Sequence, residues 1–178
     1  MATKTWVIDP SHSEVHFKIK HLMITNVTGN FNIFQIKVST DGEDFSKAAV
    51  SFTADVDSIS TGNEQRDGHL KSPDFFDAAT YPQIKFTNVK ASTVDNDGSY
   101  ELSGDLTIRD ITKNVKLSVE FGGVVIDGYG ITKAGFTING KINRKDFGLV
   151  WNSVTEAGGI VVSDEVKIMA EIQLIEQA

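Results

Sequence analysis

The chain has 178 residues, no cysteine and a net charge of −7, with 17 Lys and Arg against 24 Asp and Glu. Because the positive charges are few and scattered, nucleic-acid binding is not expected, and the lack of cysteine excludes disulfides, thiol nucleophiles and cysteine-bound metals. No linker-like stretch or change in composition divides the sequence, so we expect residues 1–178 to form a single domain.

The first residues, from Met1 to Asp9, lack the apolar core and cleavage site of a secretory signal. We therefore expect a cytoplasmic location, or a periplasmic one if a signal has been removed. No stretch approaches the roughly 20 apolar residues that a membrane-spanning helix needs, so we expect no transmembrane segment.

Apolar and polar residues alternate along most of the chain, as in strands with one buried face. Val15, Phe17 and Ile19, for example, are separated by polar side chains, and the pattern continues to the C-terminus. It predicts an all-β protein of about eight strands. These lie near residues 5–9 joined to 14–21, 29–40, 48–56, 83–94, 99–109, 112–126, 131–143 and 164–176.

Residue pairs that accept positive φ angles lie between or beside these runs and predict antiparallel hairpins. They are Asp41-Gly42, Asp97-Gly98, Gly122-Gly123 and Asp127-Gly128. The apolar side changes parity at Ile33-Phe34 and around Asn88-Val89, where we expect β-bulges.

Several predicted strands are longer than the usual five or six residues, which favours a barrel over a sandwich. A barrel of about eight strands is either filled by its own side chains or holds one small ligand. The 11 Phe residues fit both alternatives, and alternation alone leaves them open.

The segment from Arg66 to Asp77 interrupts the β pattern with charges, an imidazole and two adjacent Phe residues. Thr61 with Glu64 fits a helix capping box, and Ser72 before Pro73 fits a second helix start. A short helical insertion around residues 62–77 is therefore expected, and this segment could supply a lid.

Catalytic and metal-binding patterns are weak. The four His residues lack metal-site spacing, and no Gly-x-Ser-x-Gly motif marks a nucleophile. Serines beside His12 are expected to point elsewhere on an extended chain. Single carboxylates on the polar faces fit ordinary solvation: Asp55, Asp105, Asp146 and Glu171.

A series of short motifs, in order along nearly the whole chain, resembles the YceI family of polyisoprenoid-binding, lipocalin-like proteins. Each motif is weak alone, but the ordered set is specific. The motifs are Trp6-Val7-Ile8-Asp9-Pro10-Ser11-His12-Ser13, Phe17, His21, Gly29-Asn30-Phe31, Arg66-Asp67-Gly68-His69-Leu70, Asp74-Phe75-Phe76, Tyr81-Pro82, Leu106-Thr107-Ile108-Arg109, Thr112-Lys113 and Arg144-Lys145-Asp146-Phe147-Gly148.

The resemblance implies an eight-stranded antiparallel lipocalin-like barrel whose apolar interior holds a long isoprenoid or a similar amphiphilic lipid, without catalysis, cofactor or metal. Storage or transport of that lipid, and a link to stress response, follow as expectations. From the apolar parity we expect the wall to consist of Phe17, Ile19, Phe52, Phe86, Leu102, Leu106, Leu117, Val119, Phe136, Ile138, Ile168 and Ile172.

Phe75, Phe76 and Trp151 are expected to close the mouth of this slot. Arg66 and His69, with Arg144 as a further candidate, could meet a polar head group or could instead fix the insertion to the barrel. The turn after Arg109 has Asp110 where the family commonly has Gly, and Asp tolerates positive φ at small cost.

Two other functions fit the same sequence. The chain could be an enzyme acting on an isoprenoid or quinone-type lipid, or a stress-response interaction protein with a filled barrel. A homodimer also stays open, since alternation does not locate a surface patch.

Overall fold

The structure, a computed structural model, describes residues 3–22, 24–42, 44–93, 99–149 and 162–177. Long strands dominate it, as the alternation predicts. They are β1 (Thr3–Ile8), β2 (Glu14–His21), β3 (Thr25–Phe31), β4 (Phe34–Asp41), β5 (Asp44–Asp55), β6 (Ile59–Ser60), β7 (Gln83–Thr93), β8 (Ser99–Ile108), β9 (Ile111–Ile126), β10 (Thr132–Asn143) and β11 (Val162–Glu176).

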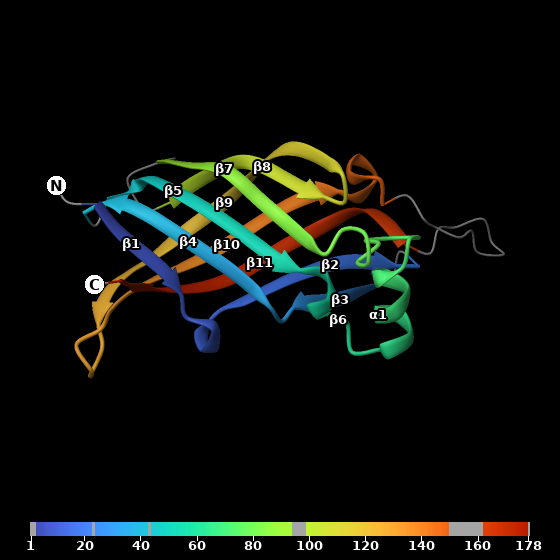
Figure 1. The fold of residues 1–178 in the computed structure, drawn as a ribbon, viewed down its shortest axis with the longest axis horizontal. Helices are drawn as coiled ribbons and strands as arrows, with labels where there is room; N and C mark the ends of the chain where they lie inside the picture. The colour runs from blue at the N-terminus through green and yellow to red at the C-terminus, as the bar shows by residue number, and fades with distance from the viewer. Residues whose placement is uncertain (1–2, 23, 43, 94–98, 150–161, 178) are drawn as a thin grey trace.

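The strands close into an antiparallel barrel (Figure 1). Hydrogen-bonded neighbours run β1-β4-β5-β7-β8-β9-β10-β11, and β11 pairs again with β1. The described strands thus form a closed ring of eight, which confirms the predicted all-β lipocalin-like fold. Closure leaves no open sheet edge along this ring.

At two of the eight positions in the barrel wall, the strand is interrupted and consists of two segments. β1 and β2 both pair with β11 and are joined by a 3₁₀ turn, η1 (Pro10–His12). β3 pairs with β2 and β4 pairs with β1, so the segments β3 and β4 together run alongside the segments β1 and β2. The break between β3 and β4 includes Ile33, where a bulge is predicted. Two further 3₁₀ turns are η2 (Val56–Ser58) and η3 (Arg144–Phe147).

The predicted bulge in β7 is confirmed. The pairing with β8 shifts between Thr87 and Lys90, and Asn88 has φ +53°. The predicted turn at Gly122-Gly123 is wrong, because both residues lie inside β9, where the pairing with β10 shifts beside Gly135. Glycine pairs suit bulges as well as turns, since both use positive φ.

Two of the other predicted turns lie where the sequence places them. Asp41-Gly42 links β4 to β5, with Gly42 at φ +61°. After β8, the positive φ belongs to Arg109, at +57°, and not to Asp110. Asp127-Gly128 begins the β9–β10 turn, but the positive φ falls on Gly130. Asp97-Gly98 lies outside the described residues.

The helix α1 (Glu64–Lys71) lies beside one end of the barrel (Figure 1). Its N-cap is Asn63, whose side chain accepts a hydrogen bond from Arg66 N, so the predicted Thr61 cap is wrong. Ser72 caps the C-terminus rather than starting a second helix, and the segment after it forms turns. Within the described residues, no helix is long and apolar enough to cross a bilayer.

Candidate functional site

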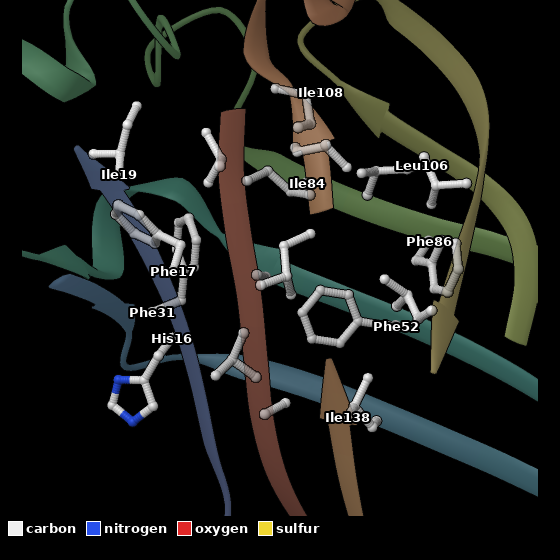
Figure 2. A pocket seen from close by; sticks show the side chains of 18 of the residues that line it. His16, Phe17, Ile19, Phe31, Phe52, Ile84, Phe86, Leu106, Ile108 and Ile138 are labelled. Carbon is white, nitrogen blue, oxygen red and sulfur yellow. The ribbon is translucent and has the colours of Figure 1, made fainter. Parts of the chain in front are cut away.

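The barrel interior holds a cavity of about 620 Å³. Aliphatic and aromatic side chains from β2, β3, β5, β7, β8 and β10 point into this shared space (Figure 2). The interior is therefore hollow, which decides between the two alternatives that alternation leaves open. A filled barrel does not describe this molecule.

All twelve residues predicted for the wall line the cavity. Their positions follow from register: Phe17 lies opposite Ile168, and Ile138 lies opposite Val119, so inward residues of neighbouring strands meet at one level. The predicted mouth residues Phe75, Phe76, Arg66, His69 and Arg144 also line it. Trp151 lies outside the described residues.

Inward-facing glycines shape this interior. A Cβ atom at Gly29 would lie 2.3 Å from Phe17 Cζ, and one at Gly140 would lie 2.2 Å from Leu117 Cδ2. Phe17 and Leu117 therefore lie flat over glycine on the neighbouring strand instead of reaching across the barrel. A large residue at either glycine would push these side chains toward the cavity.

Both termini lie at one end of the barrel (Figure 1), and aromatic side chains form a cluster near this end. Trp6 is fully buried, and its ring lies 5.0 Å from that of Phe45. Phe45 in turn lies 5.0 Å from Phe136, which stacks on Phe121 at 5.2 Å. The Trp6 indole N–H donates to Thr40 Oγ1 at 2.9 Å, so no buried donor is left without a partner there. This cluster forms a floor for the cavity.

Polar lining residues gather at the opposite end, beside α1. They include Thr61, Asn63 and Gln65 with Lys20 and His21 of β2. None of the described lining residues is Asp or Glu, although the chain contains 24 acidic residues. Within the described residues, the cavity thus has a mainly apolar body and a polar mouth without carboxylates.

Phe75 and Phe76 pack into this mouth from the segment after α1. Phe75 is only 7% exposed, and the Phe76 ring meets Phe31 of β3 edge-on at 6.3 Å. The Phe76 N–H also donates to Leu70 O at 3.0 Å, which ties the segment to α1. Helix and following turn therefore form one unit that borders the opening.

The two polar candidates on α1 already hold protein partners. Arg66 donates through Nε to Thr61 Oγ1 and through a terminal nitrogen to Thr61 O, each at 2.7 Å. His69 Nε2 lies 2.9 Å from Asp74 Oδ2, and its ring packs edge-on against Phe75. Both contacts fix the insertion, as the second of the predicted roles requires.

Arg144 is a buried structural residue in this conformation. It is 2% exposed and donates to the carbonyls of Ser163 at 2.8 Å, Leu149 at 2.6 Å and Val162 at 3.3 Å. Burial lowers the pKa of the guanidinium, and the charge of Asp164 opposes this effect. These bonds connect η3 to the start of β11.

A second polar cluster lies at η1 and has no place in the cavity lining. Contrary to expectation, Ser11 Oγ approaches His12 Nδ1, at 3.1 Å. Asp9 Oδ2 lies 2.9 Å from the same Nδ1, whereas a catalytic triad needs acid and nucleophile on opposite ring nitrogens. The cluster is therefore no triad.

Other candidate carboxylates each contact an uncharged side chain rather than one another. Asp105 accepts from Asn88 at 3.1 Å, Glu171 accepts from Thr137 at 2.9 Å, and Asp55 accepts from Gln83 at 3.4 Å. In the part of the chain that the structure describes, no group of three His, Cys, Asp or Glu side chains could hold a metal ion.

The parity rule could have found several lining residues that the sequence reasoning missed, because they flank predicted ones on the same strand. Phe45 escaped the rule because the inward parity of β5 changes between Phe45 and Ala48. The polar mouth residues gave no sequence signal at all. Missed residues include Val15, Val50, Val166, Ile84, Ile108, Phe45, Lys20, His21, Thr61, Asn63 and Gln65.

Comparisons with known proteins agree on one family. A model of the YceI-like domain matches residues 6–174. The UPF0312 protein SAS2572 of Staphylococcus aureus is 37% identical over 171 residues, covering 94% of this chain and 95% of that protein. A crystal structure of a YceI protein from Campylobacter jejuni is 35% identical, with a TM-score of 0.76 and coverage of 90% and 91%.

A third similarity concerns the fold alone. A polyisoprenoid-binding domain from Saccharophagus degradans, implicated in plant cell wall breakdown, has a TM-score of 0.68 at 18% identity. It covers 97% of this chain and 98% of that domain.

Proposed function

The chain belongs to the family of YceI-like domains, and from this premise we propose that its barrel binds one long-chain isoprenoid or similar amphiphilic lipid, for storage or transport and without catalysis. The fold similarity to a polyisoprenoid-binding domain makes this ligand class the first to test.

The observation that carries the proposal is the cavity itself. Its body is mainly apolar and measures about 620 Å³, and most of its described polar lining residues lie at one mouth. A lipid tail gains about 0.8 kcal/mol for each CH₂ removed from water, which offsets an association cost of roughly 4–15 kcal/mol once enough of the tail is buried. Affinity should therefore grow with tail length until the aromatic floor is reached.

The tail enters first in this proposal, and the head stays at the mouth beside α1. Arg66 and His69 hold the insertion in place, so they contribute by shaping the opening rather than by binding the head. Because the described lining residues include no carboxylate, the slot should tolerate an uncharged or an anionic head more readily than a cationic one.

The decisive test is native mass spectrometry of freshly isolated protein, followed by extraction and mass analysis of bound lipid. Added mass that yields an isoprenoid on extraction is expected. Protein that stays ligand-free and does not take up offered prenyl lipids of any length would contradict the proposal.

A matched pair of variants links the bound mass to the cavity. Ala170 is buried in the wall, so Ala170→Phe should narrow the cavity and reduce retention. Ala49 faces solvent on β5, so Ala49→Phe should leave retention unchanged. Circular dichroism of both variants separates loss of ligand from loss of fold.

Prolonged incubation of the loaded protein separates binding from catalysis. We expect the extracted lipid to keep its mass. A product that forms with the wild type but not with His69→Ala or Arg66→Ala would instead favour an enzyme.

A further inference from the structure

Three lysines lie directly opposite one another on the outer face of the barrel. Lys141 of β10 pairs with Lys167 of β11, which pairs with Lys18 of β2. Like charges opposite each other on neighbouring strands destabilise a sheet. Lys141 is compensated by Glu165 at 3.4 Å, but in the described chain neither Lys18 nor Lys167 forms an ion pair.

On the other side of Lys18, the neighbouring strand β3 adds no acidic side chain. Between Glu14 and Asp41 the chain contains no acidic residue, although it has 24 in total and a net charge of −7. This stretch covers β3, β2 except its first residue Glu14, and β4 except its last residue Asp41. Apart from Glu165, the lysine row thus adjoins a stretch without acidic residues on an acidic protein.

The β2–β3 turn beside this face exposes aliphatic side chains. Ile24 is 79% exposed and Leu22 is 39% exposed, with Leu22 at φ +53°. Folding alone favours Gly or Asn in that conformation, so the apolar residue there is not explained by the turn. The preceding residue, His21, lines the cavity mouth.

We infer that the β2–β3 turn and the lysine row form a docking surface for an anionic lipid bilayer. Leu22 and Ile24 enter the boundary between head groups and acyl chains, which such apolar residues reach to about 5–10 Å. Lys18 lies four residues behind Leu22, or roughly 13 Å along the strand, which places the lysines near the lipid phosphates.

Continuity with the cavity distinguishes a bilayer from an acidic protein as the occupant. The docked turn brings the mouth to the lipid surface, so a tail could pass between bilayer and cavity with little exposure to water. The β9–β10 turn also exposes apolar residues, among them Ile126 at 70%, but it lies at the opposite end of the barrel from α1 and the β2–β3 turn (Figure 1). It provides the natural control.

Flotation of the full chain with phosphatidylcholine vesicles, with and without phosphatidylglycerol, tests this inference. Binding should require phosphatidylglycerol and weaken at high salt. Each lysine near an anionic surface contributes about fivefold in affinity, so Lys18→Gln with Lys167→Gln should weaken binding about 25-fold. Lys85→Gln with Lys90→Gln, exposed on β7, should change it little.

The aliphatic part is tested by Ile24→Ser against Ile126→Ser. Only the first should reduce vesicle binding. Equal partition to neutral and anionic vesicles, or equal loss in test and control variants, would overturn the inference. Anionic binding that ignores Ile24→Ser would point to an acidic macromolecule instead and would equally overturn it.

The docking surface goes beyond the proposed function and can fail independently of it. Lys18, Lys167 and Ile24 are absent from the cavity lining, so their variants should retain the same bound mass in native mass spectrometry. Loss of vesicle binding with intact ligand retention supports docking, whereas wild-type protein that holds lipid but ignores anionic vesicles refutes docking alone.

Discussion

Individual residues in unusual positions decide how the barrel bends and holds together. Asn88 adopts φ +53° in the β7 bulge, and Arg144 is buried with its hydrogen bonds directed at three backbone carbonyls. The parity slip in the sequence marked the bulge, since an extra residue moves the apolar face by one position. Nothing in the sequence marked Arg144 as buried, because two of its three carbonyl partners lie at the start of β11.

Because Asn88 has a left-handed backbone conformation, the free energy of unfolding should depend on which residue replaces it. A β-branched residue in the left-handed region costs roughly 1–2 kcal/mol, so Asn88→Val should lower the free energy of unfolding by about that amount. Asn88→Gly removes only the exposed bond to Asp105 and should stay within about 0.5 kcal/mol of the wild type. Urea denaturation measures both. Equal stability of the Val variant and the wild type would contradict the bulge geometry.

Arg144 should matter for stability far more than its neighbour. Arg144→Met leaves three carbonyls without their donor in a buried site, and we expect a loss of about 3 kcal/mol or more. Lys145 is half-exposed and only bridges to Asp164 at 3.3 Å, so Lys145→Met should cost less than about 1 kcal/mol. Thermal unfolding of both variants gives the comparison. Similar losses would show that Arg144 is not structural.

Elements meet at η1, where a buried carboxylate connects three strands. Asp9 Oδ1 accepts from Ser11, and Oδ2 lies within 2.9 Å of His12, 3.2 Å of Gln173 on β11 and 3.7 Å of Lys133 on β10. The Asp9 N–H also donates to Gln173 O at 2.9 Å. These contacts explain how β1 and β2 stay aligned along β11 although η1 separates them.

This cluster predicts a specific pH dependence. Burial would raise the pKa of Asp9, but the hydrogen bonds and charge of His12 and the bonds from Ser11 outweigh it and lower that pKa below its ordinary value of 3.8. The ionised form therefore stabilises the folded state above the unfolded pKa, and this contribution disappears as pH falls through the folded value. Asp9→Asn should be less stable than the wild type at neutral pH.

The stability difference between wild type and Asp9→Asn should be constant above about pH 5 and should shrink below about pH 4. Urea denaturation across this range measures it. Asp44→Asn provides a control, because Asp44 is exposed and hydrogen bonds from Ser46 also lower its pKa. A difference that stays constant to the lowest pH would show that ionised Asp9 is not what joins the strands.

At the scale of the whole molecule, alternation predicted the barrel, whereas the hollow interior was expected only from the resemblance to the YceI family. Period-two alternation identifies which residues face inward, and all twelve predicted wall residues do line the cavity. Whether inward side chains meet in the middle depends on how far each one reaches. That in turn depends on contacts such as Phe17 over Gly29, which require knowledge of strand pairing.

Local signals at the insertion were more ambiguous. Thr61, Asn63 and Ser72 are all residue types that cap helices, and the correct choice depends on where the chain leaves β6. The mouth itself is assembled from α1, the segment after it and the end of β2, so its polar character emerges only from the fold. Sequence patterns describe neighbours along the chain, whereas this opening joins distant segments.

A hollow barrel should depend on its ligand for part of its stability. Wall atoms facing an empty space lose dispersion contacts, and a lipid that binds only the folded state adds about 2.7 kcal/mol at a hundred times its Kd. For a domain of this size the gain corresponds to roughly 5–10 °C in Tm. We therefore expect delipidation to lower Tm by that amount and lipid addition to restore it, as measured by calorimetry. Ala170→Phe occupies part of the same space covalently, so its Tm should respond less to lipid; a response as large as that of the wild type would place the bound lipid outside the barrel.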